Sequence, residues 1–243
     1  SAAYAASLAL HWKIGTFPHK LGALIAANPS TAAYFQERLG EGIPIHVLEH
    51  FIDIPPSPQR KTLGRAVVYM GRLSQEKGVW TILDAAHRLA DIPFHLIGAG
   101  PLEGALRQAA RERRLDNVHI HGFIAGERRF DFLREALCVI VPSLVYEQFG
   151  IAVLEAYAWE LPVIASNLGA LAHIVRDGET GLLFLAGDVA ALVASIRQLA
   201  SNPSTALAMG QQGRQLLEAA YNPETYYARL MQIYREAVAR SAG

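Results

Sequence analysis

The stretch AVVYMGRLSQEKGVWTILDAAHRLA, residues 66–90, decides the fold class because it contains a strand, a loop and a helix in sequence. The β-branched run AVVYM ends at Gly71, and a polar loop carrying Arg72 and Lys77 follows it. The segment VWTILDAAHRLA then shows the helical spacing of an amphipathic helix. An apolar strand that leads directly into such a helix is typical of a parallel sheet with both faces covered.

The same unit recurs along the chain. Further short apolar runs are PFHLIG, NVHIHG, CVIVPS and LPVIAS, and the helix-length segments between them are LEGALRQAARERR, RRFDFLREAL and IAVLEAYAWE. A short strand, TGLLF, and helices around 188–200 and 204–220 follow. The pattern predicts an α/β fold with a doubly wound, Rossmann-like parallel sheet, whose ligands bind outside the carboxyl ends of the strands.

The ends of the chain read differently from this central region. Residues 1–54 show two helices and two strands, too little to enclose a core, so we interpret them as the C-terminal remnant of a preceding α/β domain. The Pro-rich residues 55–65 read as a linker to a main domain at 66–221. Asn222-Pro223 then caps a C-terminal helix over 222–243.

Composition excludes several classes of protein. The 243 residues are 51% hydrophobic and 18% charged, with a formal net charge of +0, so no global field draws the chain to nucleic acid. The single cysteine, Cys138, lies in an apolar run and is expected in the core. With no signal-peptide pattern and no run of about 20 apolar residues, we expect a cytoplasmic protein. Peripheral attachment to the inner face of the membrane stays open.

The loop after residue 71 is the first candidate for ligand binding. Arg72 offers a planar fork of donors and Lys77 a mobile point charge, and both fall at the carboxyl edge of the predicted sheet. Two cations at that edge suit a diphosphate. The alternative is that both are ordinary solvated surface charges.

The stretch LIGAGPLEG, residues 96–104, places Gly98, Gly100 and Gly104 after a strand. It invites comparison with a dinucleotide-binding fingerprint, which would make the chain an NAD or FAD enzyme. However, the spacing is not G-x-G-x-x-G, and the following strand VHIHGFI carries no acidic residue. A tight turn that lets backbone approach a ligand fits the glycines better.

The stretch VPSLVYEQFGIAVLEAYAWELPVIAS, residues 141–166, places Glu147 in a loop and Glu155 inside the helix that starts near Phe149-Gly150-Ile151. Free N–H groups at that helix start favour an anion. Two carboxylates beside an anion site make sense if the phosphates join two sugars, because carboxylates accept hydroxyl donors well. A nucleotide sugar has that layout. The alternative for Glu155 is a capping or salt-bridging role.

These motifs together resemble glycosyltransferase family 4, retaining enzymes with two facing Rossmann-like domains, the GT-B fold. The resemblance covers about 66–240. The stretch at 141–166 resembles the family's donor-site signature, GRLSQEKG its phosphate loop, GAGPLEG its glycine loop and NVHIHGFI its base-contacting strand end. The segment IVRDGETGLLF is also typical of the family.

The resemblance implies a role for each matching residue. Arg72 and Lys77 would hold the diphosphate and stabilise the leaving group, and Glu147 would position the donor sugar, so these three form the catalytic set. Glu155 would accept the ribose hydroxyls. The donor-binding set implied by the resemblance is Gly71, Gly98, Gly100, Phe123, Ile124, Phe149, Gly150, Ile151 and Glu155. It implies no metal ligands and no cofactor apart from the nucleotide-diphosphate sugar that serves as donor.

The function expected is therefore transfer of a sugar from a UDP-, GDP- or ADP-linked donor to a hydroxyl of a glycan, lipid or small-molecule acceptor. No nucleic acid partner is expected, and the oligomeric state stays open. Because most of the acceptor-side domain is missing from these 243 residues, this chain alone would bind the donor and transfer little. The alternatives are a non-catalytic nucleotide-sugar-binding module or another GT-B enzyme, such as a nucleotide-sugar epimerase or a sugar phosphorylase. A glycosidase with two carboxylates and a dinucleotide oxidoreductase fit less well.

Overall fold

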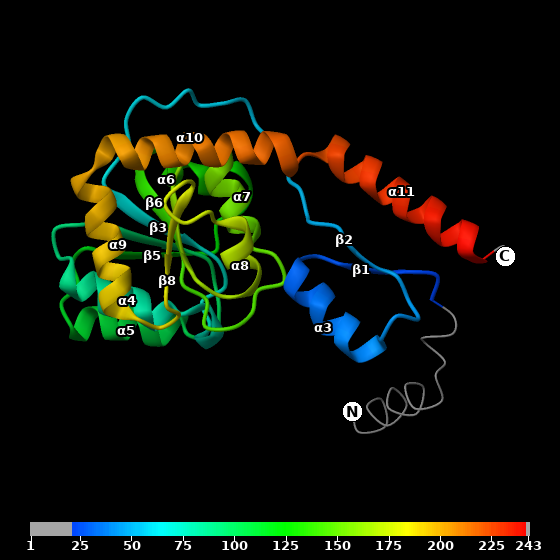
Figure 1. The fold of residues 1–243 in the computed structure, drawn as a ribbon. Coiled ribbons are helices and arrows are strands. Elements are labelled where there is room, and N and C mark those ends of the chain that lie inside the picture. Colours follow the sequence, from blue (N-terminus) through cyan, green and yellow to red (C-terminus); the bar gives the residue numbers. More distant parts are fainter. Residues whose placement is uncertain (1–20, 242–243) are drawn as a thin grey trace, which may run out of the picture. The chain divides into compact units, whose positions relative to one another are not determined.

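The structure is a computed structural model that describes residues 21–241, and the chain divides into two compact units. The larger unit is Phe51–Asn222, and the smaller one combines Ser1–His50 with Pro223–Gly243. Figure 1 shows the larger unit as a sheet sandwiched by helices. The helix expected in the first residues of the chain lies outside the described part.

The larger unit is built on six parallel strands in the order β5-β4-β3-β6-β7-β8. The strands are β3 (Ala66–Met70), β4 (Phe94–Ile97), β5 (Val118–Gly122), β6 (Ala136–Val141), β7 (Val163–Ser166) and β8 (Gly181–Phe184). Chain order runs outward in one direction from β3 to β5 and in the other from β6 to β8, so the strand order reverses between β3 and β6. This is the doubly wound, Rossmann-like sheet that the sequence predicted, with its ligand-binding crevice expected at the reversal.

Helices cover both faces of this sheet, as Figure 1 shows. On one face Val67 and Tyr69 of β3 join a core with α4 (Val79–Arg88), α5 (Glu103–Glu112) and α9 (Val189–Ser201). On the other face Val68 joins a core with α6 (Asp131–Arg134), α7 (Ile151–Ala158) and α8 (Gly169–Ile174). The long α10 (Pro203–Ala220) contributes to both cores. Cys138 is fully buried, as expected, and burial raises the pKa of its thiol.

One predicted helix is much shorter than expected. The segment RRFDFLREAL forms a 3-10 turn, η2 (Gly126–Phe130), and the four-residue α6 in place of a full helix. The reason is competition for its last residues, because β6 already begins at Ala136, which pairs with Ala66 of β3 and is fully buried. The strand register therefore ends the helix at Arg134.

The Pro-rich segment 55–64 contains no helix or strand, but side-chain hydrogen bonds tie it to the larger unit. The guanidinium of Arg60 donates to three carbonyls, those of Leu133 at 2.7 Å, Arg134 at 3.0 Å and Trp159 at 3.1 Å. These carbonyls end α6 and α7, where helices leave acceptors unsatisfied. The segment is therefore fixed on this unit, while the predicted domain boundaries stay predictions.

The smaller unit contains one strand–helix–strand element. β1 (Leu24–Ala26) pairs in parallel with β2 (Ile45–Val47), and α3 (Pro29–Leu39) connects them. Asn28 caps α3 by accepting from the N–H of Thr31 at 2.8 Å. In α11 (Pro223–Ser241), Ile233 is buried while Val238 is exposed. No helix within residues 21–241 has the length and apolarity to cross a bilayer.

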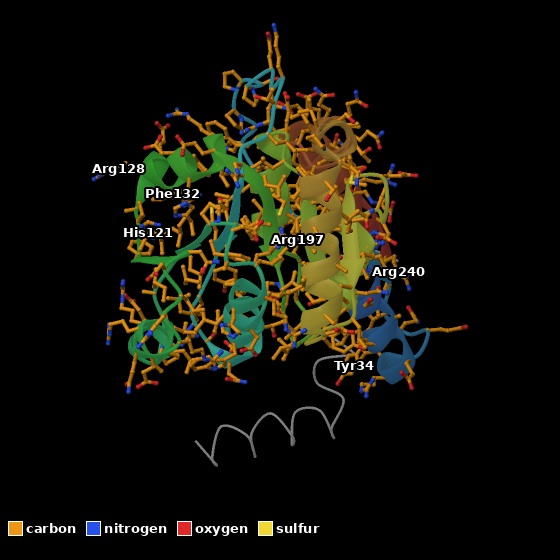
Figure 2. All side chains as sticks on the ribbon, turned by 90° about the vertical axis from the view of Figure 1, so that its left-hand side faces the viewer. Tyr34, His121, Arg128, Phe132, Arg197 and Arg240 are labelled. Atoms are coloured by element: carbon orange, nitrogen blue, oxygen red, sulfur yellow. The ribbon has the colours of Figure 1, made fainter. Side chains whose placement is uncertain are left out.

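Three histidines form a cluster on β4 and β5, at one edge of the sheet. His95 of β4 stacks on His119 and His121 of β5, each with ring centroids 5.1 Å apart, and His95 Nδ1 lies 2.9 Å from His121 Nε2. Phe132 packs on His121 at 4.4 Å, and Figure 2 shows these two side chains close together at the margin of the unit. Burial, and then the neighbouring His121 and His119, lower the pKa of His95 to about 4.

This cluster predicts an acid-sensitive fold. Folded His95 resists protonation, so the unfolded chain binds more protons between the ordinary pKa of 6.5 and about 4, and stability falls as pH drops through that window. His95→Gln removes the titrating group, so the free energy of unfolding should fall less steeply between pH 6.5 and 4. Chemical denaturation at several pH values measures the slope.

His87→Gln is the matched control for that experiment, because His87 is an exposed histidine on α4. Its pH slope should equal that of the unaltered chain. Equal slopes in His95→Gln and in the unaltered chain would contradict the assignment.

Candidate functional site

A cleft of about 440 Å³ lies at the point where the strand order reverses. It is bounded by the loops after β3, β4 and β5 and by the first turns of α7. Its lining residues are Met70, Gly71, Arg72, Ile97, Gly98, Ala99, Phe123, Ile124, Arg129, Ile151, Ala152 and Glu155. The structure thus brings together seven of the predicted site residues in one cleft, namely Gly71, Arg72, Gly98, Phe123, Ile124, Ile151 and Glu155.

Backbone hydrogen bonds between the loops make the floor of this cleft rigid. The N–H of Gly71 donates to Ile97 O, and the N–H of Leu73 donates to Ala99 O, both at 3.0 Å. In the opposite direction, Leu102 N–H donates to Leu73 O at 3.0 Å. The loops after β3 and β4 are therefore a single cross-linked platform on which Arg72 is held.

The glycines of the second loop are required by this close packing. Gly98 has φ 144°, and a Cβ placed on it would lie 1.8 Å from Gly71 O. A Cβ on Gly100 would lie 2.3 Å from Leu73 O. Gly98 lines the cleft, whereas Gly100 is not among its lining residues. The glycine loop thus serves first to let two backbone segments approach each other.

A pair of glycine substitutions tests this packing. Gly98→Ala should lower the free energy of unfolding by about 2 kcal/mol or more, because its methyl group overlaps a carbonyl that the platform fixes. Gly104→Ala is the control, since no atom lies within 4 Å of its added Cβ and the residue is helical. That control should raise stability by about 0.5–1 kcal/mol. Urea denaturation measures both, and equal effects would contradict the argument.

Lys77 and Glu147, both predicted for the site, contact each other. Lys77 Nζ donates to the two carboxylate oxygens of Glu147 at 2.6 and 2.8 Å, joining the end of η1 (Gln75–Lys77) to the loop after β6. The Glu147 side chain is only 15% exposed. The N–H of Leu144 adds a backbone bond to Glu76 O at 2.8 Å. Neither charged residue lines the cleft itself, so the structure places this ion pair outside the lining set.

The first turns of α7 line the cleft, while the side chain that precedes the helix cap is buried. Gly150 is the N-cap in a left-handed conformation, with φ 112°. Phe149 is 3% exposed, and its ring packs on Tyr221 with centroids 5.9 Å apart. Ile151, the first helical residue, lines the cleft. Phe149 and Gly150, both predicted for the donor site, are not among the residues that line the cleft.

Arg129 is a cleft residue that the sequence analysis missed. Its Nη2 donates to Oε1 of Glu155, and its guanidinium lies 4.6 Å from the centre of the Phe130 ring. Burial raises the pKa of Glu155, and Arg129 counteracts that shift. A signal was present, because Arg128 and Arg129 follow the strand end NVHIHGFI at the same edge of the sheet. Because the sequence pattern placed both arginines in a helix, they were not considered as site residues.

The charged groups of the site can bind an anion joined to hydroxyl-bearing rings. Arg72 provides a fork of donors, Glu155 an acceptor, and the apolar Phe123 and Ile124 a surface for a flat ring. Phe123 is 77% exposed, so its ring is accessible to a ligand. Among residues 21–241, no group of three or more His, Cys, Asp or Glu side chains is arranged to hold a metal ion.

A parallel sheet in this order, with a cleft at the strand reversal, defines the doubly wound class of ligand-binding α/β domain. The sequence places the protein within that class, because residues 52–216 match the family model of the glycosyl transferases group 1. The chain belongs to that family, so the resemblance to a glycosyltransferase is confirmed at the level of group 1.

Two curated relatives illustrate the range of the family. The 2-deoxystreptamine N-acetyl-D-glucosaminyltransferase of Niallia circulans is 31% identical over 195 residues, which cover 77% of this chain and 50% of that protein. The glycogen synthase of Mycobacterium tuberculosis (strain ATCC 25618 / H37Rv) is also 31% identical, over 224 residues that cover 88% of this chain and 54% of the enzyme. The chain thus spans about half the length of these relatives.

Solved structures agree on the fold. Sucrose-phosphate synthase from Thermosynechococcus elongatus matches with a TM-score of 0.77 and 28% identity, covering 90% of this chain and 59% of that one. TarM of S. aureus matches with a TM-score of 0.81 and 18% identity, covering 89% of this chain and 44% of that one. The six-stranded sheet is therefore the Rossmann-like sheet of GT-B glycosyltransferases.

Proposed function

We propose that this chain is the donor-binding part of a retaining, family 4 glycosyltransferase, which moves a sugar from a nucleotide-diphosphate sugar to an acceptor hydroxyl. The observation that carries the proposal is the cleft at the strand reversal, where Arg72 and Glu155 lie in one lining with Gly98, Phe123 and Ile124. A cation for phosphate, an acid for hydroxyls and a backbone-lined surface for a base are the three parts that such a donor needs.

The charged residues divide the work of binding and transfer. Arg72 holds the diphosphate and stabilises the negative charge that develops on it as the sugar leaves. Glu155 accepts the ribose hydroxyls. Lys77, which forms an ion pair with Glu147, holds the diphosphate together with Arg72. Glu147 positions the donor sugar and its phosphate, with the backbone of residues 149–151. In this proposal the cations replace a metal, and no cofactor other than the donor takes part.

The partner chemistry follows from the relatives. UDP accompanies glucose in the solved structure of Anabaena Alr3699/HepE, which matches this chain with a TM-score of 0.77 and 20% identity. UDP is also bound in the complex of S. aureus TarM. These names make UDP the first donor nucleotide to test, with GDP and ADP beside it. We place the reaction in the cytoplasm, with an acceptor-side domain that completes the active site.

A thermal-shift panel of UDP, GDP and ADP tests the donor site. A nucleotide that binds only the folded chain at about 100 times its dissociation constant stabilises it by about 2.7 kcal/mol, which raises Tm by roughly 5 °C. Arg72→Ala and Glu155→Ala should each abolish most of that shift, because they remove the phosphate cation and the hydroxyl acceptor.

Arg88→Ala and Glu135→Ala serve as charge-matched controls, since both residues are exposed and neither lines the cleft. They should keep the full shift. A shift that survives in Arg72→Ala and Glu155→Ala would place the nucleotide elsewhere, and the absence of any shift in the unaltered chain would overturn the proposed function.

A further inference from the structure

We propose that Arg129 is a positioning residue of the donor site, which holds Glu155 through one carboxylate oxygen and leaves the other oxygen for the hydroxyls of the ligand. The inference rests on the proposed function, because it deepens the role of the same cleft. Arg129 acts through Glu155 and need not touch the reacting atoms.

The geometry of the contact is one-sided. Nη2 of Arg129 bonds to Oε1 of Glu155, and within residues 21–241 no partner is found for Oε2. An ionised carboxylate can accept several hydrogen bonds, so one contact to an arginine leaves capacity for a diol. Both side chains line the cleft, so the carboxylate of Glu155 belongs to the cleft wall together with the arginine that holds it.

Arg129 is itself fixed by few contacts. Its guanidinium lies over the ring of Phe130, and its Nε is buried without a partner in the described part of the chain. Arg129 and Phe130 are adjoining residues of the 3-10 turn η2, so this turn carries both the guanidinium that bonds to Glu155 and the ring that the guanidinium packs on. Removing the guanidinium would leave Glu155 without the side-chain hydrogen bond that it has within residues 21–241.

Arg129 also acts on Glu155 through its charge, in addition to orienting the carboxylate by a hydrogen bond. Arg72 and Arg129 are the cations that line its cleft. A neighbouring cleft of about 650 Å³ is also lined by Arg129 and Glu155, and on that side the charged groups are the acids Asp53 and Glu127. Burial disfavours the ionised form of Glu155, and the charge of Arg129 opposes that effect.

The consequence concerns the protonation of Glu155. Burial raises the pKa of this carboxyl, and the ion pair with Arg129 lowers it, so loss of Arg129 raises the pKa further. A protonated carboxyl accepts hydroxyl donors less well, so binding should weaken as pH falls through the pKa. In a chain without Arg129, that weakening begins at a higher pH.

The experiment compares nucleotide affinity as a function of pH in four proteins. UDP, GDP and ADP are titrated calorimetrically from pH 5.5 to 8.5 into the unaltered chain, Arg129→Met, Arg129→Lys and Arg128→Met. For the nucleotide that binds, Arg129→Met should bind more weakly than the unaltered chain at the acidic end of this range, by up to about tenfold, and the loss should be smaller at the alkaline end. Arg129→Lys keeps a cation and should restore most of the affinity.

Arg128→Met is the matched control, because Arg128 is the exposed neighbour that does not line the cleft and lies at the outer edge of the unit in Figure 2. Its affinity and pH profile should equal those of the unaltered chain. Unchanged or tighter binding in Arg129→Met would overturn the proposal, since it would make Arg129 a spectator or a competitor for Glu155. A loss that is equal at every pH would overturn it too.

The carboxyl resonance of Glu155, followed by ¹³C NMR in the empty proteins, separates this inference from the proposed function. A higher titration midpoint in Arg129→Met than in the unaltered chain agrees with Arg129 as the positioning residue of Glu155. An equal midpoint overturns that role, whichever nucleotide binds. If the midpoint rises but the unaltered chain binds no nucleotide, the proposed function fails, and the claim that Oε2 receives a ligand fails with it.

Discussion

The central strand β3 is the constraint on which the rest of the larger unit depends. It bonds to β4 on one edge and to β6 on the other, and Val67 and Val68 are fully buried on its opposite faces. Because the chain moves outward from this strand in two directions, the loops after β3 and β6 diverge and leave a crevice. The cleft is therefore a consequence of strand order, and it would form with many different loop sequences.

The loops then convert this crevice into a defined site. Backbone bonds between the loops after β3 and β4 fix the floor, and Gly98 permits their approach. Two ion pairs, Lys77 with Glu147 and Arg129 with Glu155, balance the charge of one acid that lines the cleft and of one that lies outside its lining. A buried acid without such a partner would tend to protonate. The charges are thus arranged before a ligand arrives, which reduces the ordering that binding must supply.

The family match and the division of the chain into two units single out the same segment of the chain. The family match, residues 52–216, lies entirely inside the larger unit, Phe51–Asn222, and that unit contains the whole cleft. The smaller unit provides a strand–helix–strand element and α11. The chain spans about half the length of these curated relatives.

The sequence by itself determined the strands, most helices and the glycine-rich loops, because hydrophobic periodicity and turn residues act over a few neighbouring positions. It also placed Arg72 and Glu155 near the carboxyl edge of the sheet, where both line the cleft, because parallel strands all end at the same edge. Only the tertiary structure decided the partners. Lys77 and Glu147 are 70 residues apart, and Arg129 and Glu155 are 26 apart. Such pairs depend on the order of the strands in the sheet. The burial of Ala136 in β6 likewise shortened the helix that the sequence predicted around Arg129.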